Sequence, residues 1–313
     1  MKVRELGEDA LIAAFAEIYQ ARAGVLVGIG DDGAVVELRS QRQVITTDIA
    51  SDGVHFNRAW SHPVDIGAKI AIANLADVYA MGALPRYFTV ALACSGDEEV
   101  EDLLEIARGI ETMARAHGVS IVGGDVVAAD QLMISITALG EIQSLVLRSG
   151  AKVGDHIFVT QLPGKSLGGL LLLSKGLANI DSVAARMFQR PDFHPQALVD
   201  FGFTRMSALM DVSDGLISDL AKIAAASNVG INLDFDEAIL SELRELAERA
   251  GSTALELFLK SGEEHSFIVV IPQDGLAQVP NEWIRIGVAT SGGGITLRGA
   301  QLPLTATSWH WQK

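Results

Sequence analysis

The chain has 313 residues, of which 49% are hydrophobic and 20% charged, with a formal net charge of −15 at pH 7. This is a normal globular composition with enough apolar residues for two domain cores. The negative charge argues against a nucleic-acid backbone or an anionic membrane as the main partner. It does not exclude a nucleotide, because cations mediate between acidic side chains and phosphates.

The single cysteine, Cys94, excludes an intramolecular disulfide and any cysteine-based metal cluster. It lies in the apolar run "FTVALACSG", which predicts a buried structural thiol. No uncharged run approaches the roughly 18 residues that a membrane span needs. The first residues, "MKVRELGEDALIAAF", carry acids and do not resemble a signal peptide. We therefore expect a cytoplasmic protein with no membrane or nucleic-acid partner.

The first half of the chain alternates predicted helices and strands. Apolar spacing predicts helices, and short β-branched runs predict strands. The predicted helices cover residues 9–22, 63–80 and 98–117, and the predicted strands cover residues 34–38, 44–47, 87–93, 119–122 and 132–139. Strands paired around helices indicate an α/β sandwich.

The stretch "RSGAKVGD" (residues 148–155) marks a boundary by its glycines and charges. Beyond it, "LPGKSLGGLLLLSKG" reads as a loop entering a helix, and "ALMDVSDGLISDLAKIAAAS" reads as a strand, an acidic turn and an amphipathic helix. Further strands are predicted at residues 157–160, 231–234 and 267–271, and helices across residues 238–260. The predicted fold is α/β (α+β) with two domains, residues 1–147 and 148–313.

Aspartates recur beside glycines or at the predicted ends of strands. "GIGDDGAV" places Asp31 and Asp32 between glycines, and "ITTDIASDGVHF" places Asp48 at a strand end after two threonines. "VGGDVV" is expected to end a strand with Gly123, Gly124 and Asp125. Each stretch alone is compatible with a solvated turn.

Two further stretches place acids near helices. In "ANLADVYAMG", Asn74 and Asp77 are three residues apart and share one helix face, where a buried charge needs a partner. "MDVSDGLISD" offers Asp211, Ser213 and Asp214 just before a helix, where Ser213 or Asp214 alone would read as an N-cap. Together, these oxygen ligands without a histidine or cysteine cluster favour a hard cation, above all Mg²⁺ shared with phosphates. The glycines let backbone amides approach those phosphates. The P-loop pattern is absent, and "LPGKSLGG" has the wrong spacing.

Seven motifs occur in the order of thiamine-monophosphate kinases, a branch of the aminoimidazole-ribonucleotide synthetase and selenophosphate synthetase superfamily. They are "GIGDDGAV", "TTDIASDGVHF", "DIGAKIAIANLADVYAMGALP", "IVGGD", "RSGAKVGD", "MDVSDGLISDL" and "SGEEHSF". This resemblance implies an N-terminal β-sheet domain that forms a barrel with a partner subunit, hence a homodimer, and a C-terminal α/β domain. It also implies ATP and several Mg²⁺ ions.

The resemblance implies a role for each matching position. The metal-ligand positions are Asp32, Thr46, Thr47, Asp48, Asp77, Asp125, Asp211 and Asp214. Gly124, Asp125, Arg148 and Ser213 resemble the nucleotide contacts, and His55, Glu263 and Trp309 resemble the substrate contacts. Asp48, Asp77 and Asp211 would be the catalytic carboxylates. The implied reaction transfers the γ-phosphoryl group of ATP to the phosphate of thiamine monophosphate, giving thiamine diphosphate and ADP.

Three departures from the family pattern keep alternatives open. The family's Gly-Glu-Asp-Tyr reads Gly262, Glu263, Glu264 and His265 here, and Val126 replaces a hydroxyl-bearing residue. A family tyrosine near the nucleotide is matched by Ala116 or His117. One alternative is a paralogous kinase or synthetase acting on another small phosphate or alcohol, and another is a non-catalytic nucleotide-binding homologue. The first 93 residues lack the reactive cysteine of a selenophosphate synthetase, and "WHWQK" lacks that of the hydrogenase-maturation branch.

Overall fold

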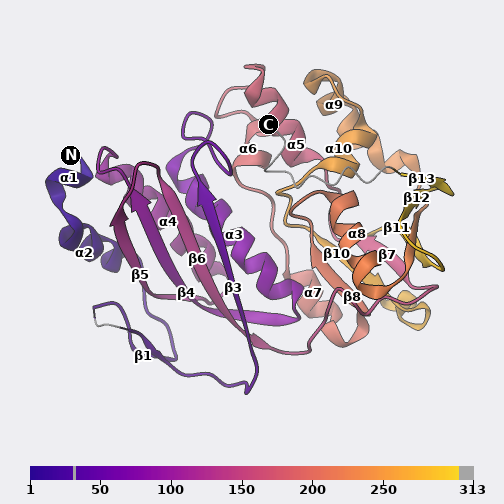
Figure 1. Ribbon diagram of the computed structural model, residues 1–313, viewed down its shortest axis with the longest axis horizontal. Coiled ribbons are helices and arrows are strands. Elements are labelled where there is room, and N and C mark those ends of the chain that lie inside the picture. The colour runs from indigo at the N-terminus through magenta and orange to yellow at the C-terminus, as the bar shows by residue number, and fades with distance from the viewer. Residues whose placement is uncertain (31–32, 303–313) are drawn as a thin grey trace. The chain divides into compact units, whose positions relative to one another are not determined.

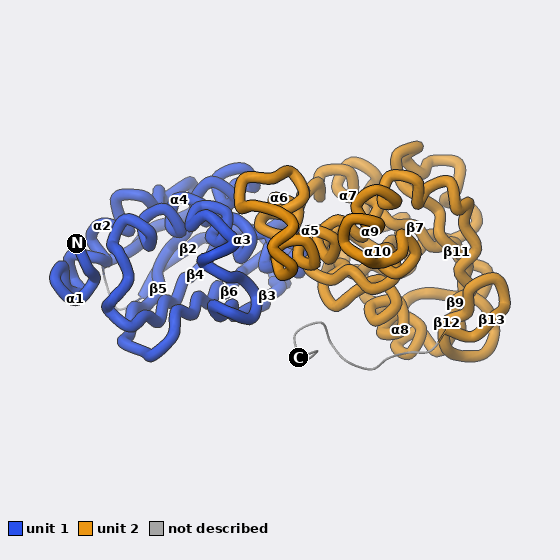
Figure 2. The backbone as a smooth tube through the Cα atoms, turned by 90° about the horizontal axis from the view of Figure 1, so that it is seen from above, with its two compact units in different colours: residues 1–78, 83–142 blue, residues 79–82, 143–313 orange. Residues whose placement is uncertain are grey.

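The computed structural model describes residues 1–30 and 33–302. They divide into two compact units, which we describe separately (Figure 2). Unit 1 comprises Met1–Val78 and Ala83–Ile142, and unit 2 comprises Tyr79–Gly82 and Gln143–Lys313. Two predicted site residues, Asp32 and Trp309, lie outside the described residues. None of the described helices has the length and apolar character needed to cross a membrane.

Unit 1 is built on a four-stranded sheet in the order β3-β6-β4-β5 (Figure 1). Its strands are β3 (Gln43–Ser51), β4 (Ala83–Cys94), β5 (Ser120–Ala128) and β6 (Met133–Ile142), and a small hairpin pairs β1 (Val25–Val27) with β2 (Val35–Val36). The helices are α1 (Val3–Leu6), α2 (Glu8–Ile18), α3 (Pro63–Ala80) and α4 (Val100–Ala116). This mixture of helices and sheet confirms the predicted α/β class.

Helices α3 and α4 lie against one face of this sheet (Figure 1). They approach each other closely because Gly67 on α3 and Gly109 on α4 have no side chain. A methyl group at Gly67 would collide with the Ile106 carbonyl oxygen, and one at Gly109 with the Val64 carbonyl oxygen. In the described part of the chain, no helix covers the opposite face, where Ile45 is 71% and Ile49 56% exposed (Figure 1). We call this the open face.

Two sequence expectations in unit 1 were wrong in detail. Asp48 and Asp125 do not end strands: Asp48 lies inside β3, and Asp125 lies inside β5. The cause is pairing, because β3 runs in unbroken register with β6 from Gln43 to Ser51, and backbone ladder bonds do not depend on side-chain polarity. The first helix also stops at Ile18 rather than residue 22, because the backbone of Tyr19 is extended and does not continue the helix.

Unit 2 contains a seven-stranded sheet in the order β13-β12-β9-β11-β7-β10-β8. The strands are β7 (His156–Val159), β8 (Ala208–Asp211), β9 (Gly230–Leu233), β10 (Phe267–Ile271), β11 (Ile284–Thr290), β12 (Ile295–Leu297) and β13 (Ala300–Gln301). The α-helices are α5 (Lys165–Ser174), α6 (Val183–Gln189), α7 (Gln196–Phe201), α8 (Leu216–Ser227), α9 (Arg244–Ala250) and α10 (Ala254–Lys260), and the 3₁₀ helices are η1 (Phe203–Arg205), η2 (Glu237–Leu243) and η3 (Gln273–Gln278).

The core of unit 2 lies on both faces of this sheet. Every residue of β10 is buried, as its uninterrupted apolar sequence predicts for an interior strand. Helix α8 contributes Leu216, Leu220 and Ile223 to the same core, at the three- and four-residue spacing of one helix face. This packing fixes the start of α8, and therefore the acidic turn before it, against the end of β8.

Candidate active site

The first group of site residues joins β3 to α3, and we call it the β3–α3 cluster: Thr46, Asp48, Asn74 and Asp77. The Thr46 hydroxyl donates to Asp77 Oδ2 at 2.6 Å. Fully buried Asn74 accepts the Asp48 backbone N–H through Oδ1 at 3.3 Å and donates to the Ile70 carbonyl oxygen at 3.0 Å. Asn74 and Asp77 therefore face the same strand, which confirms their predicted common helix face.

Strand alternation separates Thr47 from its two neighbours. Successive side chains in a strand point to opposite faces, so Thr47 lies on the open face while Thr46 faces α3. The Thr47 hydroxyl lies 2.6 Å from the hydroxyl of Thr137 on β6. The family resemblance implied that Thr46, Thr47 and Asp48 are all metal ligands, and the strand places the side chain of Thr47 on the other side of the sheet from Thr46 and Asp48.

A hollow of about 530 Å³ lies on the open face beside the glycine-rich segment that precedes β2. Its lining includes Gly30, Gly33, Thr89, Gly124, Asp125, Ser135 and Thr137. The Asp125 carboxylate accepts the Val126 backbone N–H at 2.9 Å. Gly124 is required for close strand packing, since a methyl group there would collide with the Val90 carbonyl oxygen. The hollow thus combines glycine backbone, hydroxyls and one carboxylate, a set of groups suited to phosphate and a cation.

The structure does not bring Asp125 to the β3–α3 cluster. Asp125 is on β5 and Asp48 on β3, with β6 and β4 between them. Across the paired strands, the β5 residue level with Asp48 is Gly124, one position before Asp125. The side chains of Asp48 and Asp125 therefore point to opposite faces of the sheet. Among the described residues, no group of three or more His, Cys, Asp or Glu side chains is placed to hold a metal ion. The predicted ligands therefore form separate groups within the described part of the chain.

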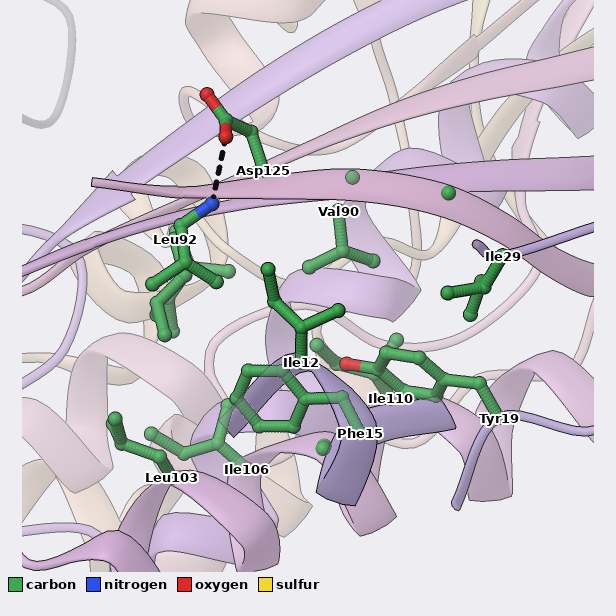
Figure 3. A pocket seen from close by; sticks show the side chains of 15 residues that line it. Ile12, Phe15, Tyr19, Ile29, Val90, Leu92, Leu103, Ile106, Ile110 and Asp125 are labelled. Carbon is green, nitrogen blue, oxygen red and sulfur yellow. Dashed lines mark hydrogen bonds between the residues drawn. The ribbon is translucent and has the colours of Figure 1, made fainter. Parts of the chain in front are cut away.

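A smaller apolar cavity of about 70 Å³ lies on the helix side of β5 (Figure 3). Phe15 on α2 and Tyr19, the residue directly after α2, form part of its wall, with ring centroids 6.0 Å apart and 25° between the ring planes. Burial, reinforced by the charge of Glu111, raises the pKa of the Tyr19 phenol and keeps it neutral. This cavity shares Ile12, Ile29, Gly123, Gly124 and Asp125 with the hollow of the open face, so the two meet around edge strand β5.

In unit 2, Asp211 ends β8 and is only 5% exposed. Its Oδ2 lies 3.1 Å from Nδ1 of buried His265. The backbone beside this pair is also fixed, because the Val212 carbonyl accepts the N–H groups of Glu264 and His265 at 3.1 and 2.9 Å. Glu263 donates its N–H to the Ser213 carbonyl at 2.8 Å and has a positive φ of 56°. The segment "GEEH" is therefore a backbone clamp on the acidic turn.

Glu264 has a separate role from its neighbours. Its Oε1 accepts the backbone N–H groups of Gly164 and Ser166 at 2.8 and 2.9 Å and the hydroxyl of Ser261. Burial raises the pKa of Glu264, against the lowering effect of these donors. The start of α5, which lies in the stretch "LPGKSLGG", is thus capped by a protein carboxylate. Glu264 therefore occupies backbone N–H groups of the kind that a phosphate loop offers to its ligand.

Sequence reasoning missed two residues that hold the acidic turn, Asp219 and Lys222 on α8. Asp219 is fully buried and bonds the backbone of Ser213 and Asp214, and Lys222 pairs with both Asp214 and Asp219. Burial raises the pKa of Asp219 to about 6. Burial alone would lower the pKa of Lys222, but the charges of Asp219 and Asp214 outweigh it and raise that pKa. The available signal was an aspartate among the apolar core positions of "LISDLAKI".

Two further predicted residues, His55 and Arg148, take part in hydrogen bonds within their own units. His55 follows β3 and accepts the Ser51 backbone N–H through Nδ1 at 3.2 Å, and its carbonyl accepts Lys69 Nζ at 3.1 Å. Arg148 is exposed, and its carbonyl accepts the Ser227 hydroxyl at 2.8 Å.

Comparison with known proteins defines first the class and then the family. Residues 30–142 match the N-terminal domain of AIR synthase related proteins, and residues 152–299 match their C-terminal domain. The chain therefore contains both domains of this class. The thiamine-monophosphate kinase of Mycobacterium tuberculosis (strain ATCC 25618 / H37Rv) is 34% identical over 93% of this chain and 87% of its own length.

Two solved structures are similar over nearly the whole chain. The thiamine-monophosphate kinase of Stenotrophomonas maltophilia K279a has a TM-score of 0.79 and 29% identity, covering 94% of this chain and 96% of its own. AaThiL complexed with AMPPCP and TMP has a TM-score of 0.77 and 28% identity, covering 99% and 98%. The chain belongs to the thiamine-monophosphate kinase family.

Proposed function

We propose that this chain transfers the γ-phosphoryl group of ATP to the phosphate of thiamine monophosphate, giving thiamine diphosphate and ADP. The observation that carries the proposal is the likeness, over 99% of this chain, to AaThiL complexed with AMPPCP and TMP. The acidic, glycine-lined sites of both units support it chemically. We infer that the reaction takes place in the cytoplasm.

The donor chemistry of the site fits Mg²⁺. Carboxylate and hydroxyl oxygens from Thr46, Asp77 and Asp211 are hard ligands of the kind that this ion prefers. We propose as ligands Asp32, Thr46, Thr47, Asp48, Asp77, Asp125, Asp211 and Asp214, with Asp48, Asp77 and Asp211 as the catalytic carboxylates. When bound, Mg²⁺ supplies charge neutralisation on the transferring phosphoryl group.

The protein's own contribution is positioning. The phosphate of the acceptor is already ionised near neutral pH, so no strong base is needed, and rate enhancement comes from holding donor and acceptor in line. The buried contact between His265 and Asp211 and the Thr46–Asp77 bond fix their carboxylates before substrate arrives. His55, Glu263 and Trp309 are the proposed contacts to the acceptor.

We propose that the nucleotide binds around edge strand β5. The triphosphate would occupy the hollow of about 530 Å³, where Gly124 and Asp125 meet the glycine-rich segment. The base would enter the apolar cavity lined by Phe15 and Tyr19, since flat aromatic surfaces pack well against a purine (Figure 3). Arg148 and Ser213 complete the proposed nucleotide contacts.

We also propose that the open face pairs with the same face of a second copy, giving a homodimer. Exposed Ile45, Ile49 and Val127 form the apolar part of this sheet surface, and large exposed apolar patches often mark protein–protein contact sites. Because a single subunit separates Asp48 from Asp125, a dimer also offers a way to complete the ligand set.

A second candidate keeps the machinery and changes the acceptor. The observation that favours it is the contact of His265 with Asp211, where the family pattern has an aromatic residue instead of the imidazole. The test is an ADP-release assay with thiamine monophosphate against a panel of small phosphates and alcohols. Signal with another acceptor but none with thiamine monophosphate would contradict the proposed substrate and retain the kinase class. Calorimetric binding of ATP with Mg²⁺ but no turnover on any acceptor would indicate a non-catalytic homologue.

A further inference from the structure

Two residues of α8, Asp219 and Lys222, hold the acidic turn of unit 2, which contains Ser213 and Asp214. Asp219 Oδ2 accepts the backbone N–H groups of Ser213 and Asp214, both at 3.0 Å. Lys222 Nζ lies 2.7 Å from Asp219 Oδ1 and 2.5 Å from Asp214 Oδ2. One carboxylate and one ammonium therefore connect the backbone of the turn, the side chain of Asp214 and the helix that follows.

Burial of the Asp219 carboxylate carries a free-energy cost that its partners must offset. The Asp219 side chain is 0% exposed, and a buried carboxylate without compensation is strongly destabilising. Two backbone donors and a cation compensate for it here, and bonds of this charge-assisted kind are about twice as strong as neutral ones. The three-residue spacing on α8 holds Lys222 beside Asp219. The turn cannot shift without breaking several of these bonds together.

We propose that Asp219 and Lys222 are positioning residues for the nucleotide and Mg²⁺, which set the places of Ser213 and Asp214. This inference rests on the proposed function, in which Ser213 contacts the nucleotide and Asp214 a metal ion. Lys222 engages Asp214 Oδ2, so Asp214 presents Oδ1 to an ion in a fixed direction. Asp219 and Lys222 bond the Ser213 and Asp214 side of the turn and not the "GEEH" segment that carries Glu263, so their loss should weaken nucleotide binding while leaving the acceptor contact in place.

The test is a mutant cycle of Lys222→Met, Asp219→Asn and the double variant, measured in the full-length protein. We expect Lys222→Met to raise the KM for ATP–Mg²⁺ and the calorimetric Kd for AMPPCP with Mg²⁺ about tenfold, with the KM for thiamine monophosphate unchanged. Because the two residues act as a unit, the double variant should be within about twofold of the worse single variant. If Asp219→Asn fails to fold, Lys222→Met and the double variant still test the inference. The double variant is expected to fold because it leaves no buried charge unpaired.

The matched control is Arg108→Met on α4. Arg108 pairs with Glu105 at the same three-residue spacing, but both side chains are about 40% exposed. In the Arg108→Met variant, the KM values for ATP–Mg²⁺ and for thiamine monophosphate should stay at the wild-type level. A folded Lys222→Met with unchanged AMPPCP affinity, equal rises in both KM values, or fully multiplicative effects in the cycle would overturn the inference. Weakened AMPPCP binding in a protein that does not phosphorylate thiamine monophosphate would contradict the proposed function and leave this inference standing.

Discussion

The acidic groups of the two units are held in different ways. In unit 1, the Asp77 carboxylate accepts a hydrogen bond from the Thr46 hydroxyl, and Asp125 lies on a sheet face that no described helix covers. In unit 2, Asp211 contacts an imidazole, Asp214 an ammonium, and the turn between them is clamped by "GEEH" and Asp219. Unit 2 thus holds its acids with an imidazole, an ammonium and backbone bonds, whereas unit 1 holds Asp77 against α3 through a hydroxyl and presents Asp125 on the open face. The comparison indicates that the acids of unit 2 are rigid before an ion binds.

The largest expected effect comes from removing one carboxylate in each unit. Asp48→Ala and Asp211→Ala should each lower ATP turnover about a hundred- to a thousandfold, as loss of a preorganised electrostatic group does. The proteins should stay folded by circular dichroism, and turnover is measured by ADP release with thiamine monophosphate. Near wild-type rates in either variant at moderate Mg²⁺ would break the assignment of that unit to the active site.

A smaller effect, on stability, is expected when the buried Glu264 side chain of unit 2 is replaced. Glu264→Ala leaves three buried donors without their acceptor, from Gly164, Ser166 and Ser261, and should lower the free energy of unfolding by about 3 kcal/mol. Glu264→Gln keeps an accepting oxygen and should cost less than about 1 kcal/mol. Urea denaturation measures both values. Equal losses in the two variants would show that charge, rather than hydrogen bonding, holds this loop.

The open face of unit 1 gives the next prediction. Ile49 is 56% exposed, so Ile49→Lys should leave the subunit folded and raise the dimer dissociation constant about tenfold or more. Sedimentation velocity over a concentration series measures the constant. Val183→Lys is the control, since Val183 is 80% exposed in unit 2 and far from the sheet of unit 1 in sequence. A variant at Ile49 that dimerises like the control would contradict this interface.

The smallest effect is a pH dependence. Burial raises the pKa of Glu264 above its ordinary value of 4.5, so the folded protein holds this proton more tightly than the unfolded chain. The sign follows from linkage: the stability contribution is full below pH 4.5 and is lost as the pH rises through the raised pKa. Glu264→Gln should therefore flatten the fall in unfolding free energy above pH 4.5, and an unchanged slope would contradict the shift.

Local patterns alone predicted much of this protein. The helix at residues 63–80 begins and ends where the sequence placed it, Cys94 is a buried free thiol, and Asn74 and Asp77 share a face. The ordered motifs also identified the family. These features are visible in sequence because helix periodicity, apolar runs and short spacings involve residues close together in the chain.

Other features were decided only by the tertiary structure. Asp48 and Asp125 lie inside strands because distant partners, β6 and β4, extend the ladders through polar residues. Glu264 caps a helix 98 to 100 residues away, and Asp211 meets His265 across 54 residues. The bonds from Asp219 to the backbone of the acidic turn are likewise visible only in the folded structure. Such contacts depend on which strands become neighbours, and chain-local physical chemistry does not specify that choice.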